Sequence, residues 1–167
     1  MRIMHISLGG CLSAPPVKYG MTEDTGGHIA YVLGAAMAQA KLPEVDEVTI
    51  VTRLFDAPEL GAVFAQADED IAPNCRVVRL ASDRAEYLEK GDLVGELPSL
   101  ENALLETLEA MGEARPDVIH AHFADAAELA LAARETFGIP VLYTAHSLGA
   151  EKLAPSEVPS VELKARI

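Results

Sequence analysis

The chain has 167 residues, half of them hydrophobic and only 5% aromatic, so it can bury a core built mainly from small and aliphatic side chains. Its net charge of -13 disfavours binding to nucleic acid or to anionic membranes, because contacts with phosphate groups need compensating cations. Small anionic ligands remain compatible with this charge, since a helix N-terminus or a few local cations can hold them.

Short apolar segments alternate with helical patterns along the chain. We expect strands at residues 3–8, 48–52, 75–80, 118–120 and 141–143, and helices at residues 26–40, 58–66, 100–111 and 126–137. In the first helix, Ile29, Val32 and Ala36 recur at three- and four-residue spacing, which places them on one face. Repeated strand–helix–strand units close into a parallel sheet. The sequence therefore predicts an α/β fold with a Rossmann-like, doubly wound parallel sheet.

The cysteines and the N-terminus indicate a cytoplasmic protein. Cys11 and Cys75 lack partners at metal-ligand spacing, which predicts free thiols in a reducing compartment. The N-terminal apolar run is too short for a signal peptide, and no later stretch is long enough to span a bilayer. We expect one domain over residues 1–167. Residues 161–167 resemble the start of a helix that no strand follows, so we expect this domain to be truncated near its C-terminal end.

Three polar clusters follow predicted strands, at the carboxyl edge where ligands bind in such sheets. The first is the segment DTGGH at residues 24–28, which opens a helix. Asp24 or Thr25 could cap that helix, and Gly26 and Gly27 would let a ligand approach the backbone closely. The positive end of the helix favours a diphosphate or a developing anion. An ordinary capped helix start explains the same segment when it is taken alone.

The second cluster contains two histidines and a carboxylate. His120 and His122 are two residues apart on a strand, so their side chains face the same way, and Asp125 follows them. These three residues could ligate a metal ion in a hydrolase. Strand-end histidines also commonly hydrogen-bond neighbouring loops, and no further carboxylate cluster completes a metal site.

The third cluster is the segment TAHSLGAEK at residues 144–152. His146 follows a strand and could donate a hydrogen bond to a sugar hydroxyl, and Lys152 could neutralise a phosphate. Ser147 lacks the G-x-S-x-G context of a nucleophile and is interpreted as a loop residue. Each of these residues could equally be solvated, so the cluster gains weight only together with the others.

Taken together, four segments resemble the N-terminal domain of sucrose-phosphate synthases and related group 1 glycosyltransferases. Residues 24–32 (DTGGHIAYV) are similar to the family's DTGGQ-x-x-YV, and residues 51–53 (VTR) to its strand-end VTR. Residues 116–126 (PDVIHAHFADA) resemble PDVIHGHYADA, and residues 144–152 match TGHSLG-x-x-K with one alanine for glycine. The resemblance implies the N-terminal half of a two-domain GT-B fold, with the C-terminal nucleotide-sugar-binding domain absent from this chain.

The resemblance also implies an activity and roles for residues. The full-length protein would be a hexosyltransferase with retention of configuration, and would need neither a metal nor a cofactor. His146 would be the catalytic residue, through a hydrogen bond to the transferred sugar as positive charge develops. The substrate-binding candidates are Gly26, Gly27, His28, Lys152, Asp125, Lys90, Lys164 and Arg166. The family carries Gln where this chain has His28, which leaves the identity of the acceptor open.

We therefore expect transfer of a hexose from a UDP-glucose-like nucleotide sugar to a hexose or hexose phosphate such as fructose 6-phosphate. The expected partners are these substrates and the protein's own C-terminal domain, with no nucleic acid and no membrane. Because the donor-binding half is missing, we expect the chain by itself to be inactive. Mannosyl transfer from GDP-mannose to fructose 6-phosphate is an alternative. So are a metal-dependent hydrolase and a non-catalytic sugar-binding module.

Overall fold

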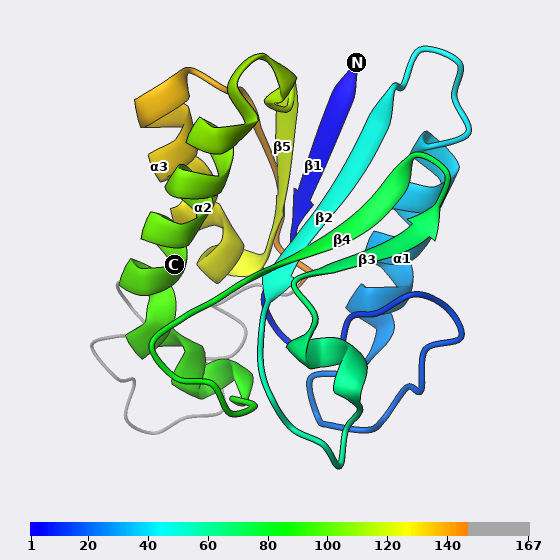
Figure 1. Ribbon diagram of the computed structural model, residues 1–167, viewed down its shortest axis with the longest axis vertical. Coiled ribbons are helices and arrows are strands. Elements are labelled where there is room, and N and C mark those ends of the chain that lie inside the picture. The colour runs from blue at the N-terminus through cyan, green and yellow to red at the C-terminus, as the bar shows by residue number, and fades with distance from the viewer. Residues whose placement is uncertain (147–167) are drawn as a thin grey trace.

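The computed structural model describes residues 1–146 and contains a central six-stranded sheet (Figure 1). The strands are β1 (Arg2–Ile6), β2 (Glu47–Arg53), β3 (Asp68–Ala72), β4 (Cys75–Leu80), β5 (Val118–His122) and β6 (Val141–Thr144). Their order is β3-β4-β2-β1-β5-β6, and only β3 runs antiparallel to its neighbour. The five parallel strands thus spread to both sides of β1, which is the doubly wound arrangement that the sequence predicts.

Helices cover both faces of this sheet, with α1 on one side and α2 and α3 side by side on the other (Figure 1). The helices are α1 (Gly27–Gln39), α2 (Leu97–Met111) and α3 (Phe123–Phe137). Short 3-10 helices lie at Ala62–Ala65, Lys90–Glu96 and Gly112–Ala114. None of the helices within residues 1–146 has the length and apolar character needed to cross a membrane.

The inner strands β1, β2 and β5 are buried on both faces, and alternate residues serve the two cores. In β1, Met4 and Ile6 pack with the residues of α2 and α3, whereas Ile3 packs with those of α1. In β2, Val51 belongs to the first core and Ile50 to the second. Because successive side chains point to opposite faces, strands covered on both sides read as continuous apolar runs. This is the pattern by which the sequence marks them.

The structure corrects several expected boundaries and adds a strand. β3 was not expected, because its sequence Asp-Glu-Asp-Ile-Ala is acidic and resembles no buried strand. It lies at the sheet edge, where charged side chains are tolerated and protect the edge from further pairing. The helix expected at residues 58–66 is wrong, since only a 3-10 turn forms there. α2 and α3 each begin three residues earlier than expected.

The loop after β1 requires glycine at one position. Gly10 has φ +82°, and a Cβ atom there would overlap the carbonyl oxygen of Asp24 and press on the side chain of Ile29. A residue with a side chain is therefore excluded by both conformation and space. The close approach brings the loop after β1 against the segment that starts α1, which fixes one wall of the site described below.

Candidate active site

An open pocket lies at the carboxyl edge of the sheet, between the loops that follow β1, β5 and β6. Its lining residues are Glu23, Asp24, Gly27, His28, Tyr31, Lys90, Phe123 and His146. Phe123 directly follows β5, and His146 lies two residues beyond the end of β6. The pocket therefore occupies the position at which ligands bind in doubly wound sheets.

The segment that starts α1 is held by its neighbours and does not cap its own helix. The Asp24 carboxylate accepts a hydrogen bond from the Lys90 backbone N–H at 2.5 Å, and the Thr25 hydroxyl accepts one from Cys11 N–H at 2.9 Å. Gly26 is the N-cap residue and makes no side-chain capping bond. The expected capping role of Asp24 or Thr25 is wrong, because both side chains are used to join the surrounding loops.

The first turn of α1 is open on its glycine side. A Cβ atom added at Gly26 or Gly27 would meet no protein atom within 4 Å. Packing within residues 1–146 does not require glycine here, in contrast to Gly10. An uncapped helix start with free space beside its backbone is suited to an anionic group, since its first N–H groups lack partners within the helix.

Backbone strain is concentrated in the pocket wall. Among the non-glycine residues of the described part of the chain, only Phe123 and His146 have positive φ, at +70° and +54°. Both residues line the pocket. Such conformations cost about 1–3 kcal/mol each and persist where the surrounding structure imposes them, often at functional sites.

All five histidines of the chain gather next to this pocket. His5 Nδ1 lies 2.9 Å from His122 Nε2, and His122 Nδ1 lies 2.9 Å from His146 Nε2. The rings of His120 and His122 are 4.2 Å apart between centroids, so these side chains share a face of β5 as expected. His28 lies further out, with its ring centroid 6.4 Å from that of His146 and its Nε2 3.3 Å from the Gly9 carbonyl oxygen.

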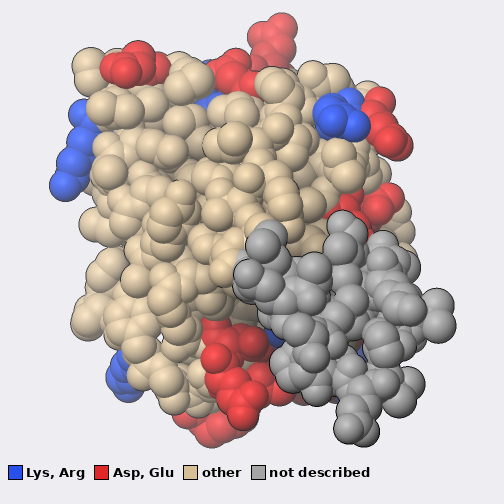
Figure 2. Space-filling model, turned by 180° about the vertical axis from the view of Figure 1, so that it is seen from behind, with Lys and Arg blue, Asp and Glu red and all other residues tan. Residues whose placement is uncertain are grey.

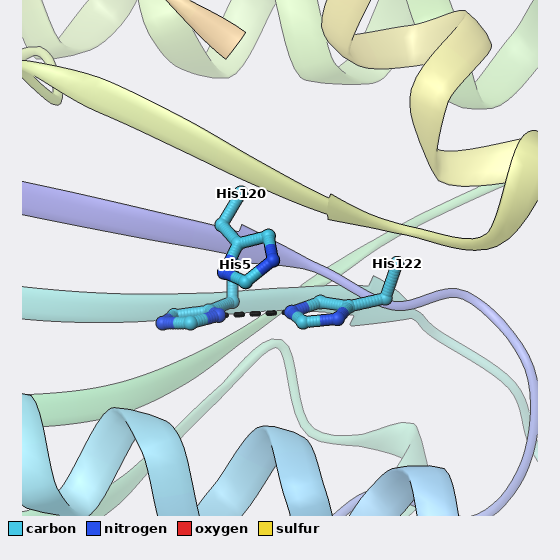
Figure 3. A group of neighbouring side chains, drawn as sticks. All are labelled: His5, His120 and His122. Atoms are coloured by element: carbon cyan, nitrogen blue, oxygen red, sulfur yellow. Dashed lines mark hydrogen bonds between the residues drawn. The ribbon is translucent and has the colours of Figure 1, made fainter. Parts of the chain in front are cut away.

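The histidine group also contacts one amide oxygen and one hydroxyl from neighbouring elements. His5 Nε2 is 2.7 Å from the side-chain oxygen of Gln39, at the end of α1. His120 Nε2 is 2.8 Å from the Thr144 hydroxyl of β6. Figure 3 shows His5 on β1 turned toward His122, with the His120 ring above both and a dashed line marking the bond between His5 and His122. Strands β1 and β5 thus contribute the inner imidazoles of this group, and β6 contributes the Thr144 hydroxyl.

Burial holds these imidazoles in their neutral form. Burial, and after it the neighbouring histidines, lower the pKa of His122 to about 2 and that of His120 to about 4. The pKa of His5 is lowered by burial in spite of its bond to Gln39, and burial also lowers the pKa values of His28 and His146. Near pH 7 each ring therefore offers one hydrogen-bond donor and one acceptor.

Three of the histidines could hold a metal ion. His5, His120 and His122 each offer a ligand atom, and these atoms lie within 4.8 Å of one another. The ligand set considered from the sequence was His120, His122 and Asp125, but the structure groups the two histidines with His5 instead. Asp125 lies buried in the first turn of α3 and does not join the group.

The pocket carries charges of both signs. Lys90 Nζ sits 2.9 Å from the centroid of the Phe123 ring, which attracts the cation through its electron-rich face. Glu23 and Asp24 are the acidic lining residues. Burial raises the pKa of nearby Glu89, and the negative charge of Asp24 is the next largest cause of that rise. On the face seen in Figure 2, the middle has few charged side chains, whereas acidic ones lie at the upper end, along the right edge and in a cluster at the lower end, toward which β1 runs in Figure 1. The net charge is thus unevenly distributed.

Several of the site residues expected from the sequence meet in this pocket. Gly27, His28, Lys90 and His146 line it, and Gly26 is the adjacent N-cap residue. Asp125 is not a lining residue. Lys152, Lys164 and Arg166 lie outside the described residues.

Sequence reasoning did not single out His5, Gln39, Tyr31 or Phe123 as site residues. A histidine inside the apolar strand β1 was the available signal for His5. Tyr31 and Phe123 fall within the motif segments but could not be distinguished there from core aromatics, and Gln39 lies eight residues beyond Tyr31 at the far end of α1.

The strand order and the pocket define a doubly wound α/β domain with an open pocket at the carboxyl edge of the sheet, where ligands bind in this class of fold. Residues 26–165 match the family model described as glycosyl transferase 4-like domain, and the chain belongs to this family.

Curated relatives and a solved structure agree with this assignment. The chain is 27% identical over 177 residues to a probable sucrose-phosphate synthase of Vicia faba, and 31% identical over 175 residues to probable sucrose-phosphate synthase 1 of Oryza sativa subsp. indica. These alignments cover 90% of this chain but only 17% and 16% of the relatives. The sucrose-phosphate synthase structure from Thermosynechococcus elongatus matches with a TM-score of 0.74 at 26% identity, over 99% of this chain and 38% of that one. The resemblance and the fold class expected from the sequence are confirmed.

Proposed function

We propose that this chain forms the acceptor-side wall of a retaining glycosyltransferase that moves a hexose from a nucleotide sugar to a hexose or hexose phosphate. The observation that supports this most is the pocket in which Gly27, His28 and His146 meet, because these residues come from separate motif segments. The relatives named sucrose-phosphate synthases favour a UDP-glucose-like donor and a fructose 6-phosphate-like acceptor.

In this proposal the uncapped start of α1 receives the donor's diphosphate. Gly26 and Gly27 leave space for phosphate oxygens beside the first N–H groups of the helix. His146 hydrogen-bonds the transferred sugar, and its imposed backbone conformation holds the ring in place before the substrate arrives. Groups fixed in advance stabilise a transition state at little reorganisation cost, so this placement favours transfer.

The acceptor is expected to lie against His28, Lys90 and the carboxylates of Glu23 and Asp24. Carboxylates accept hydrogen bonds from sugar hydroxyls, and Lys90 can bind a phosphate. His28 stands where the family carries glutamine, and an imidazole directs its donor and acceptor differently from an amide. We therefore expect the acceptor preference to be set here.

The chain spans about a sixth of the length of the curated relatives it matches, so the donor nucleotide is proposed to bind mainly to a second domain. The 167-residue chain by itself is then expected to show no sustained transfer. The complete gene product should be screened with UDP- and GDP-hexoses as donors and with fructose and fructose 6-phosphate as acceptors. Steady turnover by the isolated chain would contradict the proposal that the donor nucleotide binds mainly to a second domain.

Replacing His146 tests the catalytic assignment. In the complete gene product His146→Ala should lower kcat by about a hundredfold, within the range seen when one preorganised hydrogen-bonding group is removed. Lys41→Ala, on the exposed turn after α1, should leave kcat unchanged and serves as the control. A His146→Ala enzyme with nearly unchanged kcat would remove this residue from the mechanism.

One observation favours a second candidate, a metal-dependent hydrolase. The grouping of His5, His120 and His122 provides three ligand atoms close together. Metal analysis of the purified protein distinguishes the two functions: stoichiometric zinc, manganese or iron with hydrolysis of a sugar ester would support the hydrolase. A screen that finds transfer from GDP-mannose would instead change only the donor within the first proposal.

A further inference from the structure

We infer that Gln39, His5 and His122 form a hydrogen-bonded relay that positions His146 and determines which of its ring nitrogens is left for a ligand. Three hydrogen bonds connect these four side chains without a gap, at 2.7, 2.9 and 2.9 Å. The relay runs from the end of α1 through β1 and β5 to His146, two residues beyond the end of β6. Gln39, His5 and His122 are positioning residues, since only His146 among them lines the pocket.

The polarity of the relay follows from its end at Gln39, whose side chain is partly buried. Gln39 presents its side-chain oxygen, which can only accept, so His5 Nε2 must carry the proton. A neutral His5 then has an unprotonated Nδ1, which can only accept a bond from His122 Nε2–H. The same reasoning leaves His122 Nδ1 as an acceptor for His146 Nε2–H. Each ring therefore transmits the choice of tautomer to the next.

The consequence for the pocket is that His146 Nδ1 has no proton and accepts hydrogen bonds. Within residues 1–146 the structure gives this nitrogen no partner, whereas Nε2 is bonded to His122. A sugar hydroxyl, which can donate, would satisfy it. The burial of His5 and His122, both below 2% exposure, keeps water from competing for the relay's hydrogen bonds.

The direct bond between His5 and His122 also bears on the metal-ligand grouping. An ion held between the facing nitrogens of this pair, His5 Nδ1 and His122 Nε2, would displace the proton of the hydrogen bond that joins them at 2.9 Å. Their rings are nearly parallel, with an interplanar angle of 10°, as expected for an in-plane hydrogen bond. A relay and a metal centre are therefore mutually exclusive uses of these two side chains.

Nitrogen NMR of the full 167-residue chain labelled with 15N-histidine tests the relay directly. We expect His5, His122 and His146 each to populate one tautomer with the proton on Nε2, and to show scalar couplings across both hydrogen bonds between the rings. A protonated His146 Nδ1, or absent couplings, would overturn the relay. So would one equivalent of zinc bound by the chain with loss of the couplings, because the rings would then be ligands.

Two variants at Gln39 separate the relay from a merely structural role. Gln39→Glu keeps an acceptor next to His5 Nε2, so the tautomers of all three rings should stay as in the wild type. Gln39→Lys can only donate, so the proton should move from Nε2 to Nδ1 on all three rings. Unchanged tautomers in a folded Gln39→Lys chain would refute the inference; if that variant fails to fold, the Gln39→Glu spectrum and the wild-type couplings still decide.

The effect of the relay on catalysis rests on the proposed function, whereas the tautomers of the three rings can be tested without it. In the complete gene product, Gln39→Lys should lower kcat about five- to tenfold, the cost of one misdirected hydrogen bond, while Gln39→Glu stays near the wild type. If Gln39→Lys reverses the tautomers but leaves kcat unchanged, the relay exists but has no role in transfer. An inactive wild-type protein with the expected spectrum would count against the proposed function and not against the relay.

Discussion

Single residues in this chain divide into those required by the protein's own packing and those that leave room for something else. Gly10 belongs to the first kind, because its positive φ and the nearby Asp24 carbonyl exclude a side chain. Gly27 belongs to the second kind, since nothing in the described chain occupies the space beside it. This difference separates a structural glycine from a candidate ligand-binding one, and it is measurable.

Alanine at Gly27 should stabilise the fold and impair function. Because Gly27 is helical and its added Cβ would meet open space, Gly27→Ala should raise the free energy of unfolding by up to about 1 kcal/mol in urea titrations. The same Cβ would enter the space proposed for the donor phosphates and lower turnover of the complete gene product.

Gly34→Ala is the matched control for this substitution. Gly34 lies in the same helix, is exposed, and also has open space beside it, but it does not line the pocket. It should gain similar stability without losing turnover. Equal turnover in the two variants would mean that the space beside Gly27 is not used by a substrate.

At the scale of elements, the end of β2 is joined to the segment between β4 and α2 by one arginine. Arg53, only 2% exposed, donates from Nε to the Ser82 hydroxyl at 2.9 Å and from Nη1 to the Glu86 carbonyl at 2.8 Å. Nη2 donates to the carbonyl oxygen of Arg84. The strand-end VTR motif therefore ends in a residue that holds a loop, and that loop leads to Lys90 in the pocket.

Arg53→Lys should destabilise the chain by about 2 kcal/mol or more, because an ammonium group cannot reach three acceptors arranged for a planar fork. Arg76→Lys is a suitable control, since Arg76 is partly exposed and pairs with Glu47 at 3.0 Å. An exposed pair of this kind contributes about 1 kcal/mol or less. Urea unfolding of both variants measures the difference, and similar losses would show that Arg53 does not anchor the loop.

At the scale of the whole molecule, five histidines from distant parts of the sequence meet at one edge of the sheet, and this makes stability depend on pH. The pKa of His120 is lowered to about 4 and that of His122 to about 2, from an ordinary value of 6.5. The unfolded chain therefore binds more protons than the folded one below pH 6.5. The contribution of these rings is complete above pH 6.5 and is lost as the pH falls toward 4 and below.

His122→Gln should reduce this pH dependence. Each additional proton taken up on unfolding costs about 1.4 kcal/mol per pH unit, and glutamine takes up none. The variant is expected to be less stable than the wild type at pH 7 but to lose less stability between pH 7 and pH 5. Free energies of unfolding from urea titrations at several pH values measure both slopes. Parallel slopes would show that His122 is not held neutral in the folded chain.

The sequence by itself determined the fold class and part of the candidate site. Apolar runs such as residues 48–52 mark strands covered on both faces, and the motif segments place Gly27, His28 and His146 after predicted strands. These features are local, so they can be read along the chain. The acidic edge strand β3 and the short 3-10 turn near Phe64 were missed, since each is stabilised by its neighbours and not by its own pattern.

Only the tertiary structure decided how the site residues are connected. His5 and Gln39 are 34 residues apart, and His5 and His122 are 117 apart, yet they hydrogen-bond directly. No local periodicity records such pairs, because the packing of α1 on β1 and the side-by-side placement of β1 and β5 create them. Conversely, Asp125 is close to His122 in sequence but lies in the first turn of α3, outside the histidine group.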